Sequence, residues 1–281
     1  MELSEKIKRF RKENGFSQEE LAERLAVSRQ AITKWETGIG IPDVVNLKAL
    51  AGLFGITVDE LLSDTPTGCT DSVTEYDVDE SKHFDVSIGC AAKITVRGAE
   101  TEKIKVRLSS AVKHGIKVKI EEIKGKMDVS VRRTGSMTDA ELKKELSIVV
   151  ELPVKYLIGI ELEAVCTELT LENLPTHIEY DGKADVVRLR GNNGHIELDV
   201  GVDMRIYADG LNADLDVNQL SCASVLRLPE RTSFVATKKG LSNRLHFMKN
   251  GIAVDAPQPS ENAPTVRLNG RNSELIVELT D

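Results

Sequence analysis

The apolar residues of this 281-residue chain follow two different periods, and the change falls near residue 64. Before that point they recur at helical spacing, as Leu3, Ile7 and Phe10 do. After it they alternate with polar residues, as in the run Ile104-Lys105-Val106-Arg107-Leu108. These periods predict helices first and half-buried strands afterwards. We therefore expect a multidomain chain with a helical domain at 1–64, a linker at 65–75 and a mainly β domain at 76–281.

The helical domain is expected to hold five short helices. Ser17 and Glu20 have the spacing of a capping box at the start of the second helix. Ser28 caps the third, which runs to about Glu36 with Trp35 facing the core. A turn of about three residues joins the second and third helices, which is the arrangement of a helix-turn-helix. The basic residues of the first helix are expected outside its apolar stripe: Lys6, Lys8, Arg9, Arg11 and Lys12.

The outward face of the third helix carries side chains suited to base edges. Arg29, Gln30, Thr33 and Lys34 point away from the predicted core. Arginine can bond guanine in a bidentate way, and glutamine can do the same with adenine. Gln18 lies in the first turn of the second helix, where a helix N-terminus favours a phosphate.

The ordered run Ser17-Gln18-Glu19-Glu20-Leu21-Ala22, Val27-Ser28-Arg29-Gln30-Ala31-Ile32 and Trp35-Glu36-Thr37-Gly38 resembles the lambda-repressor-like (Xre/Cro) DNA-binding domain. The resemblance covers residues 3–62, and it implies that the third helix reads bases. It assigns base contacts to Arg29, Gln30, Lys34 and Thr33. It assigns phosphate contacts to Gln18, Ser28 and Arg11. It also pairs Arg11 with Glu36 as structural support of the site, beside Trp35 in the core.

Two positions depart from the pattern of that family. Ala26 stands in the turn where glycine is common, and a left-handed alanine costs on the order of 1 kcal/mol. The loop Ile39-Gly40-Ile41-Pro42-Asp43 lacks the basic residues that some members use on the DNA backbone. Few phosphate contacts imply modest affinity per domain. We therefore expect a homodimer or higher oligomer.

The β-rich part contains alternating strands and one helix, which Thr138 and Glu141 begin with a second capping box. Residues 75–135 carry a net charge of +3. From about residue 157 two sets of triplets recur every 17 to 19 residues, ending at Tyr180, Leu198 and Val217 and at Leu171, Leu189 and Ile206. This spacing predicts stacked β-coils.

The expected turns between the coils are Asp181-Gly182, Asn193-Gly194 and Asp209-Gly210. Asn269-Gly270 is expected to form a hairpin that closes the end of the stack. The region loosely resembles the adhesin-like β-solenoid domains of bacterial proteins, which in several regulators follow a helix-turn-helix. That resemblance implies a fold and little about chemistry. A β-sandwich is the alternative.

Composition narrows the function classes. With 41% hydrophobic and 29% charged residues the chain is globular, and its net charge of −8 argues against coating nucleic acid by bulk charge. No signal peptide or membrane-spanning run is evident, so a cytoplasmic location is expected. Four widely spaced cysteines suit reduced thiols: Cys69, Cys90, Cys166 and Cys222.

No catalytic motif is found, so an enzyme, a cofactor and a metal site are not expected. Acidic outward positions are interpreted as a solvated face, with a cation-binding ladder as the alternative: Glu179, Glu197, Asp199, Asp214 and Asp216. The sequence thus predicts a sequence-specific transcriptional regulator, a repressor that occupies an operator with an inverted repeat of double-stranded DNA. Its β domain would oligomerise the protein or sense an unknown effector. The alternative is an antitoxin-like or scaffold protein whose β domain binds a protein partner.

Overall fold

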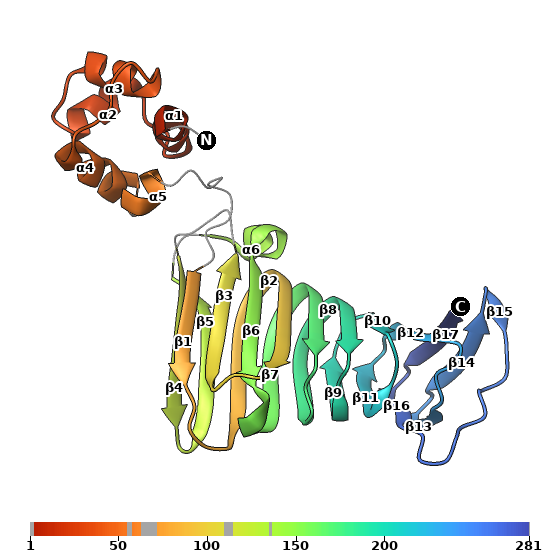
Figure 1. Cartoon of the computed structure of the whole chain (residues 1–281). Coiled ribbons are helices and arrows are strands. Elements are labelled where there is room, and N and C mark those ends of the chain that lie inside the picture. The colour runs from red at the N-terminus through yellow and green to blue at the C-terminus, as the bar shows by residue number, and fades with distance from the viewer. Residues whose placement is uncertain (1–2, 55–57, 63–71, 110–114, 135–136, 281) are drawn as a thin grey trace. The chain divides into compact units, whose positions relative to one another are not determined.

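The computed structural model describes residues 3–54, 58–62, 72–109, 115–134 and 137–280. The chain divides into two compact units, Met1–Thr70 and Asp71–Asp281. The first unit is helical and the second is built mainly from strands (Figure 1). Residues 65–71 of the expected linker lie outside the described part of the chain. None of the described helices is both long enough and apolar enough to cross a membrane.

The helical unit has the five predicted helices around one apolar core. They are α1 (Leu3–Glu13), α2 (Gln18–Arg24), α3 (Arg29–Glu36), α4 (Val44–Phe54) and α5 (Val58–Leu62). Ile7, Leu21, Ile32 and Leu50 are completely buried in that core. The expectation that Lys6 is exposed is wrong. Its side chain is buried, and Nζ donates a hydrogen bond of 3.3 Å to the carbonyl oxygen of Leu61, because the chain returns there 55 residues later.

The strands of the β-rich unit form two largely parallel sheets that share one core. The first sheet runs in the order β4 (Ile116–Ile123), β5 (Lys126–Arg133), β2 (Lys82–Ala99), β7 (Leu157–Glu172), β8 (His177–Arg190), β9 (Asn193–Val200), β11 (Asn212–Leu220), β16 (Thr265–Arg271) and β13 (Val235–Leu241). In this sheet only the pairing of β4 with β5 is antiparallel among the described residues.

The second sheet contains the other strand of each coil. It runs in the order β1 (Ser72–Asp77), β3 (Lys103–Ser109), β6 (Ser147–Pro153), the later halves of β2, β7 and β8, then β10 (Arg205–Ala208), β12 (Ala223–Pro229), β17 (Glu274–Thr280), β14 (Arg244–Lys249) and β15 (Ile252–Ala253). A three-residue helix η1 (Val154–Tyr156) connects β6 to β7. Parallel stacking of coils confirms the predicted β-solenoid, since the alternative sandwich would be antiparallel.

Each long strand passes from one sheet to the other at a corner. In β8 the buried positions are even-numbered up to Ala184 and odd-numbered from Val187 onward. In β7 the same change falls between Cys166 and Leu169. Because side chains alternate across a strand, this change of parity keeps apolar side chains inside after the chain turns. One strand can therefore supply two sides of a coil.

The predicted triplets stack in register for the most part. Ile178, Ile196 and Leu215 are successive partners across β8, β9 and β11. In the second sheet the third triplet is shifted by two residues. Ile206, not Met204, is the partner of Val187, so the triplet is Ile206-Tyr207-Ala208.

The prediction of a turn at Asp181-Gly182 is wrong, because both residues lie inside β8 and pair with Asp199 and Val200. Gly182 serves a close approach instead. A Cβ atom there would lie 1.9 Å from the carbonyl oxygen of Ala164 on the neighbouring coil. The prediction of a turn at Asn193-Gly194 is also wrong, because these two residues begin β9 and pair with Asn212 and Ala213. Asp209-Gly210 connects β10 to β11, as predicted.

The C-terminal coil differs most from the prediction. Asn269-Gly270 does not form a hairpin, because β16 and β17 do not pair with each other. Instead β16 lies between β11 and β13, and β17 lies between β12 and β14 (Figure 1). The last coil of the chain is therefore inserted into the stack, and the preceding coil, β13 with β14, forms the end. That end coil places Lys238 and Lys249 opposite the core residues Leu268 and Leu279. The lysine on the edge strand β13 discourages further strand addition there, whereas β14 is already paired with β15 at Lys249.

The helix α6 (Asp139–Glu145) has the predicted capping box, since Thr138 Oγ1 accepts from the Glu141 amide and Glu141 bonds back to Thr138. Leu142 and Leu146 anchor it on the β core. The outward basic residues of the neighbouring strands pair with carboxylates; Lys105, for example, lies 3.2 Å from Glu75.

Three cysteines are free: Cys90, Cys166 and Cys222. Burial raises the pKa of the Cys166 thiol to about 12. Cys69 lies outside the described residues.

Candidate DNA-binding surface

The turn between α2 and α3 sets the direction of the third helix. Ala26 has a φ of 53°, the left-handed conformation expected at this position. The Val27 amide donates to the carbonyl of Ala22 at 3.0 Å, which closes the turn. Ser28 then caps α3, because its Oγ accepts from the Ala31 amide at 3.2 Å. The turn and the cap at Ser28 therefore set Arg29 as the first residue of α3.

One face of α3 is fixed in the helical core. Ile32 is completely buried, and Trp35 and Glu36 are each 8% exposed. Trp35 thus lies in the core, as the sequence predicts. A buried carboxylate such as Glu36 requires partners, because an unpaired charge inside a protein is strongly destabilising.

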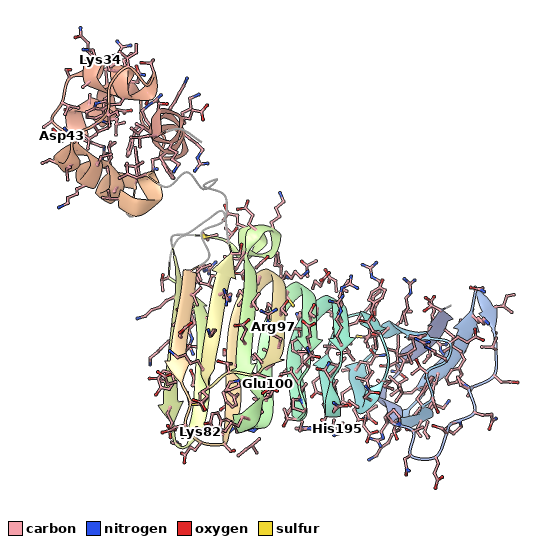
Figure 2. The ribbon with its side chains drawn as sticks, in the orientation of Figure 1. Lys34, Asp43, Lys82, Arg97, Glu100 and His195 are labelled. Atoms are coloured by element: carbon pink, nitrogen blue, oxygen red, sulfur yellow. The ribbon has the colours of Figure 1, made fainter. Side chains whose placement is uncertain are left out.

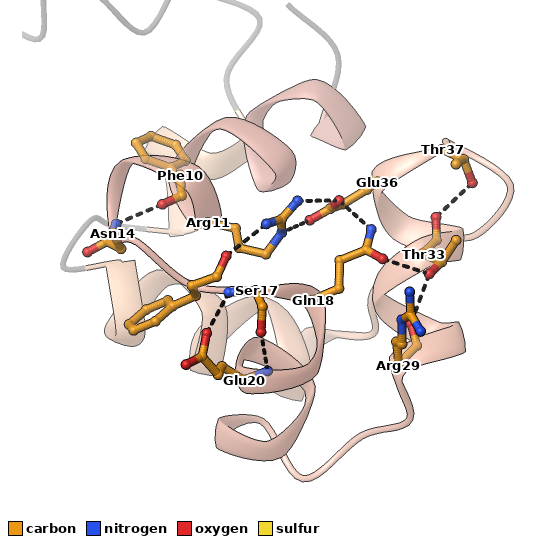
Figure 3. Close-up of polar contacts among 11 residues, drawn as sticks. Phe10, Arg11, Asn14, Ser17, Gln18, Glu20, Arg29, Thr33, Glu36 and Thr37 are labelled. Atoms are coloured by element: carbon orange, nitrogen blue, oxygen red, sulfur yellow. Dashed lines mark hydrogen bonds and ion pairs between the residues drawn. The ribbon is translucent and has the colours of Figure 1, made fainter.

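Three helices meet at the carboxylate of Glu36 (Figure 3). Arg11 of α1 donates from Nε to Oε1 at 2.5 Å and from Nη2 to Oε2 at 3.1 Å. Gln18 of α2 donates from Nε2 to Oε2 at 2.8 Å. The third nitrogen of Arg11, Nη1, donates to the carbonyl of Phe16 at 2.8 Å. We call Arg11, Gln18 and Glu36 the clamp, because they hold α3 against both preceding helices.

The clamp shifts the acid–base behaviour of its members. Burial alone would raise the pKa of Glu36, but hydrogen bonds from Arg11 and Gln18 outweigh it and hold that pKa below its ordinary value. The same hydrogen bond raises the pKa of Arg11. Both groups are therefore stabilised in their charged forms.

The opposite face of α3 is exposed. Arg29 is 63% exposed, and its Nη1 lies 2.8 Å from Glu19 Oε1. Gln30 and Lys34 are exposed and form no polar side-chain contact with the described residues. Figure 2 shows Lys34 at the outer margin of the helical unit. The donors proposed to read bases are thus presented together on one helix surface.

Thr33 lies between the exposed face and the clamp. Its Oγ1 is placed to donate to Gln18 Oε1, 3.3 Å away, or to the carbonyl of Arg29, 3.1 Å away. Thr33 therefore connects the clamp to the exposed face of α3.

The residues predicted to touch phosphate are less free than those predicted to touch bases. The hydroxyl of Ser28 caps α3, both ends of the Gln18 amide are bonded, and the side chain of Arg11 is only 11% exposed. Gln18 nevertheless contacts Thr33 beside the exposed face of α3.

The residue that the sequence analysis missed is Glu19. Glu19 lies on α2 and forms an exposed ion pair with Arg29 on α3. Residue spacing along one helix does not predict a contact between two helices, so the sequence predicts a role for the neighbouring Gln18 and none for Glu19.

An exposed apolar patch adjoins this surface. Ile39, Ile41, Val44 and Val45 are between 66% and 79% exposed. We call these four residues the apolar patch. Groups of exposed apolar side chains on a soluble domain mark contact surfaces more often than single ones do.

Comparison with known proteins shows which family and which proteins the helical unit is similar to. Residues 7–61 match the family model described as Helix-turn-helix. A segment of 63 residues is 49% identical to the HTH-type transcriptional activator BcrR of Enterococcus faecalis, covering 22% of this chain and 31% of BcrR. A segment of 78 residues is 33% identical to the SPbeta prophage-derived HTH-type transcriptional regulator YonR of Bacillus subtilis (strain 168), covering 28% of this chain and 66% of YonR. The chain thus matches less than two thirds of the length of either relative.

The β-rich unit has structural neighbours among adhesin-like proteins. The crystal structure of a cell-adhesion-like protein from Clostridium sporogenes covers 75% of this chain and 100% of that protein, with 10% identity and a TM-score of 0.40. A likeness this distant carries no statement about activity. The solenoid described above rests on the strand pairing itself.

Proposed function

We propose that this chain, whose N-terminal unit is a helix-turn-helix domain of the Xre/lambda-repressor-like class, is a cytoplasmic, non-enzymatic regulator that binds double-stranded DNA. The observation that carries the proposal is the two-sided character of α3. One face is fixed by the clamp and the core, and the other presents Arg29, Gln30 and Lys34 to solvent.

In this proposal α3 enters the major groove. Arg29 leaves Glu19 and bonds a guanine in a bidentate way, and Gln30 does the same with an adenine. Lys34 and Thr33 contact neighbouring base edges, with Lys34 also able to meet phosphate. Ser28, Gln18 and Arg11 lie near the DNA backbone and fix the register of the helix. Phosphate contacts are few, so binding depends strongly on salt and on a second domain.

We propose a homodimer or higher oligomer that places two α3 helices about one helical turn apart on an inverted repeat. The apolar patch supports contact with a second copy, since its side chains remain in water in the single chain. Occupancy of an operator would then repress transcription. The relative BcrR is described as an activator, which is the alternative sign of regulation.

The β-rich unit would oligomerise the protein or sense an effector. A cavity of about 450 Å³ supports the sensing role. Apolar residues of the core, including Leu142 and Leu146, line it together with Cys90, Arg132 and Asp139. A cavity of this size can hold a small amphipathic molecule. The second candidate is an antitoxin-like or scaffold protein whose β-rich unit binds a protein partner, and exposed apolar side chains of that unit such as Ile158, Leu241 and Ile252 support it.

Genome-wide mapping of bound sites with the native protein tests the class. Enrichment of an inverted repeat near one operon would support the regulator, whereas uniform occupancy of the genome would oppose it.

The Arg29→Ala variant then tests the mechanism on the enriched site. Loss of one bidentate contact should reduce discrimination between that site and random DNA by about 1–3 kcal/mol. Lys48→Ala removes one positive charge from α4 and serves as the matched control. It should leave discrimination unchanged. Equal discrimination by wild type and Arg29→Ala would contradict the assignment.

A further inference from the structure

A group of metal-ligating side chains lies on the outer face of the first sheet. His177 on β8 and His195 on β9 are register partners, and their ring centroids are 5.2 Å apart. Glu197 follows two residues after His195 and therefore faces the same side of the strand. One nitrogen of each histidine and one carboxylate oxygen of Glu197 lie within 4.8 Å of one another. The stacking of two coils thus brings together three donor atoms that are distant in the sequence.

The two nitrogens of His195 have different surroundings. Nε2 is buried, forms no hydrogen bond within the described chain, and lies 3.5 Å from Oδ2 of Asp216 on β11. Asp216 itself is buried and held by Arg267, whose Nη1 donates to both of its oxygens at 2.8 Å. Nδ1 lies 3.7 Å from Glu197 Oε1. That separation exceeds a hydrogen bond and is the span that two ligands of one ion have.

Asp216 thus lies behind the ring, on the side of Nε2, while Nδ1 lies on the side of Glu197. A carboxylate behind a histidine that faces a metal is the usual second layer of a zinc site. The sequence analysis interpreted Asp216 as part of a solvated face. Its burial and its contact with Arg267 correct that interpretation.

A second group on the same face provides a comparison. His83, Asp85 and Glu161 also lie within ligand distance of one another. There, however, the ammonium group of Lys126 lies 3.2 Å from Asp85 and 3.3 Å from Glu161. A cation thus already balances those carboxylates. Across the described residues no lysine or arginine forms an ion pair with Glu197. The first group therefore has no side-chain cation in the place that a metal ion would take.

We propose that His177, His195 and Glu197 bind a divalent transition-metal ion, for which Zn²⁺ is the best match. Two imidazoles and one carboxylate are a ligand set that zinc accepts, with water completing a tetrahedron. Hard ions such as Ca²⁺ and Mg²⁺ prefer oxygen ligands and are not favoured here. The bound ion joins β8 to β9, so it would brace the middle of the solenoid. This proposal is independent of DNA binding.

Full-length protein dialysed at fixed micromolar free zinc provides the test, with bound metal measured by mass spectrometry and replacement by Co²⁺ followed by its visible absorption. The wild type should hold one zinc per chain. His177→Ala and Glu197→Gln should each weaken binding by at least about 10-fold, the lower range for disturbing a zinc site. His177 is exposed, so its loss is not expected to unfold the strand. Circular dichroism of each variant checks that it is folded.

His246→Ala is the matched control, because His246 is a half-exposed histidine whose Nε2 lies 3.3 Å from Glu274 without a second histidine. It should bind zinc as the wild type does, and so should His83→Ala. Absence of zinc from the wild type would overturn the proposal. So would unchanged binding in His177→Ala, or loss of zinc in His83→Ala rather than in His177→Ala.

Discussion

Arg11 and Glu36 form a two-point ion pair between α1 and α3, with N–O distances of 2.5 and 3.1 Å and only 2% of the Glu36 side chain exposed. The contact joins residues 25 positions apart. It fixes the helix that presents the proposed base-reading side chains. Several expectations depend on it.

Removing the arginine should destabilise the helical unit. Arg11→Ala leaves Glu36 buried without its main partner, which costs about 3–5 kcal/mol. Trp35 is the single tryptophan of the chain and lies in α3, so its fluorescence during urea unfolding reports on this unit. Lys48→Ala, on the exposed side of α4, should change the midpoint little. An unchanged midpoint in Arg11→Ala would show that the pair contributes nothing.

The same pair predicts a loss of stability in acid. The folded-state pKa of Glu36 is lowered, whereas its unfolded value is about 4.3. The unfolded state therefore binds the proton more readily, and the stabilisation is present above about pH 4.3 and lost as the pH falls through the lower folded value. Urea midpoints from Trp35 fluorescence between about pH 6 and pH 3 measure this decline. Glu36→Gln should show a shallower decline, and an equal slope in both proteins would assign the acid effect to other groups.

Gln18 should have two separable roles. Gln18→Ala removes a hydrogen bond to a buried carboxylate, for which a loss of about 1.5–3 kcal/mol of stability is expected. As a phosphate neighbour it should also weaken binding to all DNA sequences alike. Fluorescence anisotropy with operator and random duplexes measures the second effect. A loss confined to the operator would instead place Gln18 in base reading.

Glu19 should restrain Arg29 in the free protein. Glu19→Gln removes the exposed ion pair, which contributes about 0–1 kcal/mol, and it removes a negative charge beside the proposed DNA surface. Affinity for DNA should therefore rise, most clearly at low salt. Glu23→Gln removes the same charge from the last turn of α2 and separates general charge from the specific pair. Weaker binding by Glu19→Gln would mean that Glu19 helps to place Arg29 in the complex.

The inserted C-terminal coil should tolerate no side chain at Gly270. This residue has a φ of 131°, and a Cβ atom there would lie 1.8 Å from the carbonyl oxygen of Gln219 on β11. Gly270→Ala should cost about 2 kcal/mol or more, measured as a lower melting temperature of the β signal in circular dichroism. Gly201→Ala has no atom within 4 Å of the added carbon and is the control. Equal melting of the two variants would contradict the close packing of these coils.

The parts of the fold that can be predicted from the sequence depend on neighbouring residues and on repeats along the chain. The capping box of Ser17 and Glu20 follows from a few adjacent residues, and the left-handed Ala26 follows from the family resemblance. The rungs at Ile178 and Ile196 follow from a repeat of side-chain size and polarity. The Arg11–Glu36 contact came from the family resemblance, because no spacing rule joins two residues 25 positions apart.

The parts of the fold that cannot be predicted from the sequence depend on contacts between residues far apart along the chain. Lys6 is buried because it bonds the carbonyl of Leu61 in another helix. Asn269-Gly270 has the composition of a hairpin turn, yet the strands on either side find partners in other coils. The ligand group at His177 and His195 exists only because two coils stack in register. Short-range sequence patterns do not specify which coils become neighbours in the stack.

The insertion of β16 and β17 between two earlier coils also separates the order of synthesis from the order of assembly. A ribosome releases β13 and β14 before the strands that must lie beneath them have been made. Rung-by-rung growth during translation can therefore proceed as far as β12 and must then wait until β16 and β17 have been made. A truncation between β14 and β16 would remove an inner layer and leave the end coil with nothing to stack on.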